Sequence, residues 1–563
     1  MSGIFLNPKG NNAFTDILNN RINKVFVDKT DFIGETIDRL DSDAKLIAFT
    51  RPRRFGKTVM AQMLASYYSK EADSRSVFSG RKISGYKSIK LIDNQEVDVT
   101  YETFINKFDV IYIDMNTVDS RYATYLNREK KHKAADIVDF LENLVISDLM
   151  EHDDFASILK KEKIGNIGLA DALSAIHRTS GITFILIMDE WDLIYRDYRQ
   201  DTMLQKKFID WLKGLFKSSD GLECFSLVYL TGILPIRKYN SQSALNNFKE
   251  YNMLSPEPFE KYFGFTEDDI SQIVEMPWCK LTRENMKYWY EGYKLNGVDV
   301  YNPNSVASAV ADGKCKCYWS GSSSNEEFVR LINLNFKGIK TDIIKLLNGM
   351  KLPFSSDKFK NDMTSISDKD DVFSLLVCLG YLGCADLQNG KKIAYVPNHE
   401  IRQTLLSLVK GQNWSKRIDA VKRSERLFKA IVRKHDGKAV AEIIQEIHND
   451  TSVSLFDYNT EDSLTYCVMS AMQWATLDSY DCHREEQSGK GRVDVVYEPL
   501  GMNNIPLIII EFKYGRSAAA AITQIKKMEY YKRYIQRYKN IILVGINYSK
   551  TTKEHECLIE CLN

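Results

Sequence analysis

Short apolar runs alternate with longer amphipathic stretches along the first 255 residues. Four of the runs are dominated by apolar residues, as expected of strands buried on both faces. They are Lys45–Thr50, Val110–Asp114, Phe184–Asp189 and Phe225–Thr231. The stretches between them, such as Thr58–Ser69 and Ala134–Met150, repeat apolar residues at helical spacing. This alternation predicts a parallel sheet with helices on both sides.

The hydrophobic pattern changes further along the chain. Residues 256–312 are helical in pattern and rich in aromatic residues, and residues 313–330 are polar and rich in Gly and Ser, which indicates a loop or a domain junction. Residues 331–470 are mainly helical in pattern, with one strand-like stretch near Lys392–Val396. Strands return after about residue 471, at Val493–Tyr497, Leu507–Lys513 and Ile541–Ile546. A long basic helix, Ser517–Tyr538, is predicted between the last two strands.

These patterns predict an α/β protein with four regions. They are a parallel-sheet domain over residues 1–255, a helical lid over 256–315, a mainly helical middle domain over 316–470 and a C-terminal α/β domain over 471–563.

Composition excludes several classes of protein. Hydrophobic residues make up 44% of the 563 residues and charged residues 27%, which argues against disorder. With 76 basic and 75 acidic residues the net charge is +1, so any contact with nucleic acid requires a local basic patch. The ten cysteines lack the spacing of a zinc site or a disulfide framework. The N-terminus does not resemble a secretory signal, and no apolar run approaches the roughly 20 residues of a membrane span. We therefore expect a soluble, cytoplasmic protein.

A candidate phosphate-binding loop follows the first predicted strand. Residues 51–58 read RPRRFGKT and lead directly into a helical pattern, which is the order that such a loop requires. Lys57 would contact the β- and γ-phosphates, and the Thr58 hydroxyl would bind Mg²⁺. The predicted nucleotide contacts of the loop are Arg53, Arg54, Phe55, Gly56, Lys57 and Thr58. Arg51 stands where the usual motif has its first glycine, and Gly-Lys-Thr alone also fits a basic surface loop.

Two carboxylates end the predicted strand Phe184–Asp189. Asp189 would hold Mg²⁺ through water, and Glu190 would polarise the attacking water. The alternative is an ordinary core strand with a solvated acidic end. The presence of both the loop and the acidic strand end in one chain favours a nucleotide site. The strand Phe225–Thr231 ends in Thr231, a candidate sensor of the γ-phosphate, although Thr-Gly also makes a plain turn. Arg237 is a candidate arginine finger, for which a solvated loop arginine is the simpler interpretation.

A second group of charged residues lies near the C-terminus. Asp494 belongs to one predicted strand, and Glu511 and Lys513 stand two residues apart on the next, so they project from the same face. Buried carboxylates need a cation or a hydrogen-bonding network, and Mg²⁺ prefers oxygen ligands. Asp494 and Glu511 are therefore candidate metal ligands, and Lys513 is a candidate to orient or deprotonate the attacking water. A plain salt bridge between the strands is the alternative.

The predicted helix that follows is basic. A basic helix beside a metal site could track a nucleic-acid backbone, and Gln524 and Tyr530 could reach back toward the site. Its basic residues are Lys526, Lys527, Lys532, Arg533, Arg537 and Lys539. Solvated lysines on an amphipathic helix are the alternative.

Taken together, these strings resemble a known family. RPRRFGKTV, IMDEWD, Trp289–Val306, Leu379–Gln403, GRVD, IIIEFK and AAITQIKKMEYY are similar to the AAA-ATPase-like family, whose members commonly end in a nuclease-like domain of the PD-(D/E)XK superfamily. The resemblance implies a P-loop NTPase-type domain and a restriction-endonuclease-like domain. For the nucleotide it implies Lys57, Thr58, Asp189 and Glu190. For the nuclease-like site it implies Asp494, Glu511 and Lys513, with Gln524 as an accessory.

The resemblance also implies an acidic residue on an earlier helix of the nuclease-like domain. Family members often have Glu where this chain has Gln487, so Glu485 or Glu486 is expected to substitute for it.

The resemblance further implies ATP and Mg²⁺ as cofactors, DNA as a partner and a possible homo-oligomer. The leading hypothesis is an ATP-hydrolysing protein fused to a Mg²⁺-dependent DNase-like domain under nucleotide control. The alternatives are a nucleotide-gated DNA-binding scaffold with an inactive nuclease-like domain, and a protein in which both sites are vestigial.

Overall fold

The computed structural model describes most of the chain as two compact units. The described residues are 5–7, 14, 17–18, 25–92, 95–128, 136–161, 168–236, 245–319, 322–334, 336–347, 349–356, 359, 366–387, 391–411, 416–449, 461–476, 479–488, 490–500 and 505–562. The first unit comprises Met1–Ile339 with Lys351–Leu405, and the second comprises Lys340–Met350 with Leu406–Asn563. The four domain boundaries derived from the sequence stay predictions.

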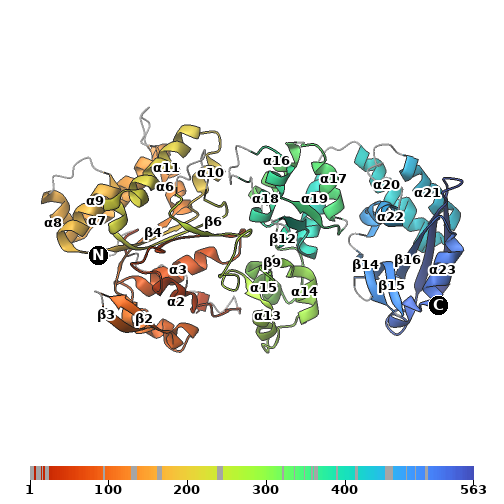
Figure 1. Ribbon diagram of the computed structural model, residues 1–563, viewed down its shortest axis with the longest axis horizontal. Coiled ribbons are helices and arrows are strands. Elements are labelled where there is room, and N and C mark those ends of the chain that lie inside the picture. Colours follow the sequence, from red (N-terminus) through yellow and green to blue (C-terminus); the bar gives the residue numbers. More distant parts are fainter. Residues whose placement is uncertain are drawn as a thin grey trace. The chain divides into compact units, whose positions relative to one another are not determined.

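A parallel sheet of five strands forms the core of the first unit, in the order β4-β5-β6-β1-β7. Its strands are β1 (Leu46–Thr50), β4 (Asp109–Asp114), β5 (Phe184–Asp189), β6 (Phe225–Gly232) and β7 (Lys249–Tyr251). Every residue of β1, β5 and β6 is buried, because helices cover both faces of the sheet (Figure 1). The α/β class and the four predicted strands are confirmed, whereas β7 was not predicted.

The helices of this sheet domain lie on its two sides (Figure 1). On one side are α2 (Phe32–Ile37) and α3 (Lys57–Tyr68), and on the other are α6 (Met115–Arg128), α7 (Ile137–Glu151), α9 (Leu169–Ser180) and α11 (Thr202–Lys217). The shorter helices are α4 (Arg75–Phe78), α5 (Tyr101–Phe104), α8 (Asp153–Lys161), α10 (Leu193–Asp197) and α12 (Ser219–Glu223). The predicted helices at Thr58–Ser69 and Ala134–Met150 correspond to α3 and α7.

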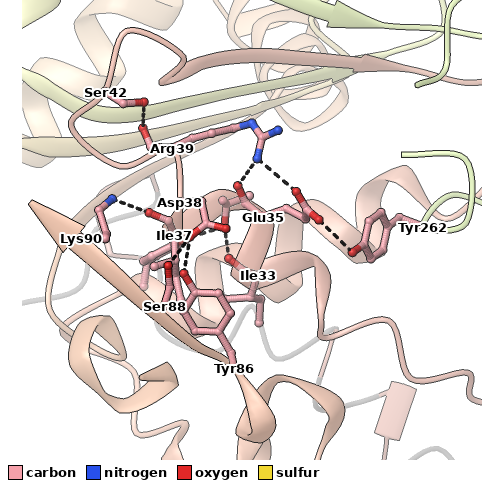
Figure 2. Close-up of polar contacts among 12 residues, drawn as sticks. Ile33, Glu35, Ile37, Asp38, Arg39, Ser42, Tyr86, Ser88, Lys90 and Tyr262 are labelled. Carbon is pink, nitrogen blue, oxygen red and sulfur yellow. Dashed lines mark hydrogen bonds and ion pairs between the residues drawn. The ribbon is translucent and has the colours of Figure 1, made fainter. Parts of the chain in front are cut away.

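A hairpin of β2 (Lys87–Ile92) and β3 (Gln95–Thr100) is attached to α2 by polar contacts (Figure 2). Lys90 donates from Nζ to the carbonyl oxygen of Ile37 at 2.6 Å, and Asp38 accepts hydrogen bonds from two side chains at the start of the hairpin. Glu35 of the same helix accepts a hydrogen bond from the hydroxyl of Tyr262 at 3.4 Å. The bond from Tyr262 to Glu35 places this ring beside the cavity described below.

The region predicted as a helical lid contains a small sheet as well as helices. Its elements are β8 (Phe265–Thr266), α13 (Glu267–Val274), α14 (Arg283–Tyr290), β9 (Tyr293–Leu295), β10 (Val298–Tyr301) and α15 (Pro303–Asp312), and the strands pair in the antiparallel order β8-β10-β9. Next come α16 (Ser322–Asn333), α17 (Ile339–Leu347), β11 (Leu352–Phe354), α18 (Lys369–Leu379), β12 (Gly383–Asp386), β13 (Lys392–Tyr395) and α19 (His399–Gly411). The strand expected near Lys392–Val396 is β13, in a three-stranded sheet.

The second unit is built on a mixed sheet in the order β14-β15-β16-β17-β18, in which only β16 and β17 are parallel. The strands are β14 (Tyr480–Ser488), β15 (Gly491–Pro499), β16 (Leu507–Tyr514), β17 (Ile541–Tyr548) and β18 (His555–Leu562). The helical elements are α20 (Lys416–Lys429), η3 (Ala430–Lys434), α21 (Gly437–Asn449), α22 (Glu461–Thr476), α23 (Ala518–Lys527) and η4 (Tyr530–Arg533).

The predicted long basic helix at Ser517–Tyr538 is wrong in its length. Helix α23 ends at Lys527, and Glu529 takes a left-handed backbone with a φ of 56° before the short turn η4. The turn buries the rings of Tyr530 and Tyr534 in the apolar cluster beneath the sheet, and this tertiary packing overrides the helical pattern. Within the described part of the chain, no helix is both long and apolar enough to cross a membrane.

Candidate functional sites

The candidate phosphate-binding loop, called the phosphate loop below, connects β1 to α3, as the sequence predicts. Gly56 caps α3 with a φ of 84°, a conformation that glycine adopts without steric cost, and Lys57 is the first residue of the helix. A Cβ atom at Gly56 would meet no atom within 4 Å, so this glycine is required by backbone conformation and not by lack of space. The loop therefore presents the N-terminus of a 12-residue helix, which favours an anion.

Lys57 and Glu190 meet at the carboxyl edge of the parallel sheet. Strand β6 lies between β1 and β5, and its Thr231 pairs in register with Asp189. Lys57 is 4% exposed, and its Nζ lies 3.9 Å from Oε1 of Glu190 and donates to the carbonyl oxygen of Pro52 at 3.1 Å. The structure thus brings the two sequence motifs together, although their strands are not neighbours.

Asp189 is buried at the end of β5 beside the phosphate loop. Burial raises the pKa of Asp189 to about 7, although a hydrogen bond from Thr58 opposes the shift. A buried carboxylate in this position is stabilised by a cation, and Thr58 and Asp189 are the hydroxyl and carboxylate that Mg²⁺ uses beside a phosphate loop. These two residues therefore fit a Mg²⁺ ion bound with a nucleotide.

Glu190 is held by a second cation that sequence reasoning missed. Its carboxylate forms an ion pair with Arg196 of α10, whose Nε lies 3.0 Å from Oδ2 of Asp192. Burial alone would raise the pKa of Glu190, but the cations Lys57, Arg196 and Arg53 outweigh it and lower that pKa. The spacing of Asp192 and Arg196, four residues apart directly after Glu190, was the available signal.

A cavity of about 670 Å³ opens over the loop, within the usual range of ligand-binding pockets. All six predicted loop residues line it, and so do Glu190 and Arg196. Apolar side chains complete the wall, among them Phe14, Val25, Phe26, Tyr262 and Phe265. Asp189 and Thr231 are buried and are not among the described lining residues. The candidate finger Arg237 lies outside the described residues.

The loop also packs against the middle of the first unit. Phe55 is fully buried and meets the ring of Tyr293 edge-on at 5.1 Å, and Arg54 donates to the carbonyl oxygen of Tyr318. Arg51, in the position of the missing glycine, is fully buried and donates to the carbonyl oxygens of Thr50 and Tyr251, each at 2.9 Å. Arg51 thus supports the loop from within the fold and is not among the described residues that line the cavity.

One prediction concerns Gly380, the C-cap of α18. Its φ is 85°, and a Cβ atom there would lie 2.7 Å from Cβ of Pro52 and 2.8 Å from the Trp319 ring. We expect Gly380→Ala to lower the free energy of unfolding by about 2–4 kcal/mol and to weaken ATP binding, because the phosphate loop must shift. Gly181→Ala is the control, since Gly181 has a φ of 73° with open space around it. If thermal unfolding shows the same loss of stability in both variants, the contact between Gly380 and the phosphate loop does not contribute to stability.

The second site lies on neighbouring strands of the C-terminal sheet. Oδ2 of Asp494 on β15 accepts a hydrogen bond from the backbone N–H of Phe512 at 2.7 Å. On β16, Glu511 is 1% exposed, and its Oε1 accepts hydrogen bonds from Lys513 at 3.0 Å and from Gln524 of α23. The structure therefore brings all four predicted residues of this site together.

The electrostatics of this site fit a divalent cation. Burial raises the pKa of Asp494 to about 6, and burial together with the charge of Asp494 raises the pKa of Glu511 to about 7. The Oε2 atom of Glu511 is buried without a hydrogen-bond partner. A bound cation would stabilise the charged forms of both carboxylates and would give the buried Oε2 atom of Glu511 a partner. Among the described residues no three His, Cys, Asp or Glu side chains form a ready metal cluster, so water would complete the ligand shell.

Glu461 is the residue of this site that sequence reasoning missed. It is the first residue of α22, and its Oε1 lies 3.5 Å from Nζ of Lys513. A pocket of about 320 Å³ is lined by Glu461 and Asp494, together with Glu485 and three further residues. The only sequence signal was an acidic residue at the start of an amphipathic helix.

The expected helical acid at Glu485 or Glu486 is wrong in its placement. Both residues belong to β14, because the backbone at Glu486 pairs with Val493 of β15. Glu485 has a φ of 50° and its carboxylate lies 3.3 Å from Arg484. The side chain of Glu486 lies outside the described residues.

Several basic residues after the site are paired with acids on the surface. Lys526 lies 2.5 Å from Glu560, and Arg537 lies 2.7 Å from Glu498. These pairs support the alternative that such residues are ordinary solvated charges.

The first unit thus carries a phosphate-loop site on a parallel sheet, and the second carries a carboxylate–lysine site on a mixed sheet. Residues 8–240 match the family model described as predicted AAA-ATPase, and residues 461–556 match the model of the PD-(D/E)XK nuclease superfamily. The chain therefore fuses an AAA-ATPase-like domain to a C-terminal domain of the PD-(D/E)XK nuclease superfamily, which confirms the resemblance.

The chain is also similar to a protein over nearly its whole length. An uncharacterized protein in the vnfD 5' region of Azotobacter chroococcum mcd 1 is 20% identical over 547 residues, which cover 94% of this chain and 93% of the relative. The similarity therefore extends over both matched domains, at a low level of identity.

Proposed function

We propose that the protein binds and hydrolyses ATP with Mg²⁺ in its first unit and cleaves DNA with Mg²⁺ in its second, under the control of the nucleotide. One observation carries the proposal. In each unit a lysine and a carboxylate meet in a mostly buried cluster, with Lys57 3.9 Å from Glu190 in one and Lys513 3.0 Å from Glu511 in the other. Clusters of this kind suit the handling of phosphate and metal charge.

In the ATP site the protein's own groups have distinct roles. The loop N–H groups and Lys57 bind the phosphates, and Thr58 and Asp189 hold Mg²⁺, which neutralises phosphate charge when bound. Glu190 polarises the attacking water. Thr231, in register with Asp189, is proposed as the sensor of the γ-phosphate.

In the nuclease-like site Asp494 and Glu511 hold Mg²⁺, which supplies charge stabilisation at the scissile phosphate. Lys513 orients the attacking water and offsets phosphate charge, and Gln524 fixes the carboxylate of Glu511. Glu461 is placed to share the proton or the charge of Lys513.

Nucleotide control needs a connection that begins at the phosphate loop. Arg54 donates to the carbonyl oxygen of Tyr318, whose own N–H donates to Oε1 of Glu400 at 2.6 Å. Glu400 is fully buried near the start of α19, the helix that contains the boundary between the two units, at Leu405 and Leu406. A change at the loop therefore has a route of direct contacts to that helix, and ATP biases the chain only through contacts that differ between its states.

A second function is a nucleotide-gated DNA-binding protein with an inactive nuclease-like domain. It is favoured by the lack of a ready three-residue metal cluster among the described side chains. DNA is the proposed partner in either case, and homo-oligomers and a cytoplasmic location remain proposals.

The test is incubation of supercoiled and linear DNA with the full chain and Mg²⁺, with and without ATP, and with EDTA as control. Cleavage that requires Mg²⁺ and changes with ATP supports the proposal. ATP-dependent retention of uncut DNA supports the second function. Absence of ATP binding in titration calorimetry, together with absence of cleavage, contradicts both.

A further inference from the structure

Arg196 is a buried cation that points into the nucleotide cavity. It is 8% exposed, lies on the short helix α10 directly after β5, and lines the cavity with Lys57 and Glu190. Its guanidinium forms ion pairs with Glu190 and, through Nε at 3.0 Å, with Asp192. A buried guanidinium paired with two carboxylates is restricted in position by both ion pairs.

Asp192 fixes Arg196 from the side of the sheet. It is fully buried, and its Oδ2 accepts hydrogen bonds from the backbone N–H groups of Ile233 at 3.2 Å and Leu234 at 2.8 Å, directly after β6. A Cβ atom at Gly232 would lie 2.4 Å from Oδ1 of Asp192, so only glycine leaves room for this carboxylate. The anchor of Arg196 is therefore built into the end of the strand that lies between β1 and β5.

Glu190 in turn is held at both carboxylate oxygens. Its Oε2 pairs with Arg196, while its Oε1 lies 3.9 Å from Nζ of Lys57. Its backbone has a φ of 55°, an uncommon conformation for a residue other than glycine and one often found at functional sites. The backbone conformation and the two cations together restrict the orientation of the carboxylate beside the phosphate loop.

We propose that Arg196, anchored by Asp192, is the positioning residue that orients the Glu190 carboxylate toward the attacking water of the ATPase reaction. The inference rests on the proposed ATP hydrolysis and adds to it a residue that acts through Glu190. Misplacing a catalytic group by about 1 Å costs roughly 100-fold in rate, whereas ground-state binding by the loop and Lys57 is left in place. Loss of Arg196 should therefore lower kcat and leave the affinity for ATP nearly unchanged.

The test compares ATP turnover and the binding of a fluorescent ATP analogue in the wild type and in Arg196→Ala, Arg196→Lys and Asp192→Asn. We expect Arg196→Ala to lower kcat by about 10- to 100-fold with the dissociation constant for the analogue changed by less than about threefold. Arg196→Lys keeps a cation beside Glu190 and should recover part of the loss, and Asp192→Asn should fall between Arg196→Ala and the wild type.

Arg199→Ala is the matched control, because Arg199 pairs with Glu327 and donates to the backbone carbonyl oxygen of Arg196, so its loss leaves the side chain of Arg196 in place. A kcat within about twofold of the wild type is expected for it, since the ion pairs of Glu190 stay intact. The inference is overturned if Arg196→Ala keeps full kcat, if kcat and affinity fall together, or if Arg199→Ala loses as much activity. A wild type that hydrolyses no ATP is a different outcome, which refutes the proposed ATPase and this role with it.

Discussion

Replacing Glu511 by glutamine is expected to reduce Mg²⁺-dependent DNA cleavage by at least about 100-fold. The substitution removes the charge that would hold the metal but keeps one oxygen to accept the hydrogen bonds of Lys513 and Gln524. Burial and the neighbouring charge of Asp494 raise the pKa of Glu511 to about 7, so a neutral amide should be tolerated in the fold. Cleavage of supercoiled plasmid, thermal unfolding and DNA binding are measured on the same preparation.

A stable fold with cleavage lost assigns Glu511 to the chemistry. Glu560→Gln is the control, because Glu560 lies on the same sheet but pairs with Lys526 at the surface. A surface ion pair of this kind contributes less than about 1 kcal/mol, so cleavage and stability should change little in the control. If Glu511→Gln cleaves as fast as the wild type, the carboxylate–lysine site does not cut DNA.

Replacing Lys57 by alanine is expected to reduce ATP turnover by at least about 100-fold. Lys57 is the buried cation at the N-terminus of α3 that would bind the β- and γ-phosphates. The fold should survive, because Arg196 still pairs with Glu190 after the substitution. ATP affinity should also fall, since the lysine contacts the phosphates in the ground state, and this distinguishes Lys57 from Arg196. Release of inorganic phosphate and titration calorimetry measure the two effects.

Lys70→Ala is the control for Lys57→Ala. Lys70 lies just beyond the other end of α3 and pairs with Asp109 at 2.7 Å, outside the described lining of the cavity. Its loss removes an ion pair at the opposite end of α3 without touching the phosphate loop, so ATP turnover should remain near that of the wild type. Turnover that survives in Lys57→Ala would remove the phosphate loop from the reaction.

The central strands could be predicted because they are buried on both faces. Phe184–Asp189 is apolar up to its last residue, and its predicted bounds are those of β5. Edge strands carry weaker patterns: β7 has only three residues, and the residues of β3 are exposed except at Val99. Their pairing depends on neighbours distant in sequence, so the local pattern could not show it.

The candidate sites were predictable where a motif holds its residues close in sequence. Glu511 and Lys513 share one strand, and Lys57 and Thr58 share one turn of helix. Glu461 lies 52 residues before Lys513 in the sequence, on a helix, so no local spacing could predict their contact. The four-residue spacing of Asp192 and Arg196 was a local signal for their ion pair. The proposed role of Arg196 depends on its contact with Glu190, and that contact is created by the turn after β5.

We propose that two separate charged centres, one in each unit, carry the two activities. The most direct measurement is a paired assay of ATP turnover and Mg²⁺-dependent DNA cleavage in the wild type, Lys57→Ala and Glu511→Gln. We expect Lys57→Ala to lose turnover while keeping the cleavage seen without nucleotide, and Glu511→Gln to lose cleavage while hydrolysing ATP at the wild-type rate. Loss of both activities in either variant, in a protein that unfolds at the wild-type temperature, would contradict this proposal.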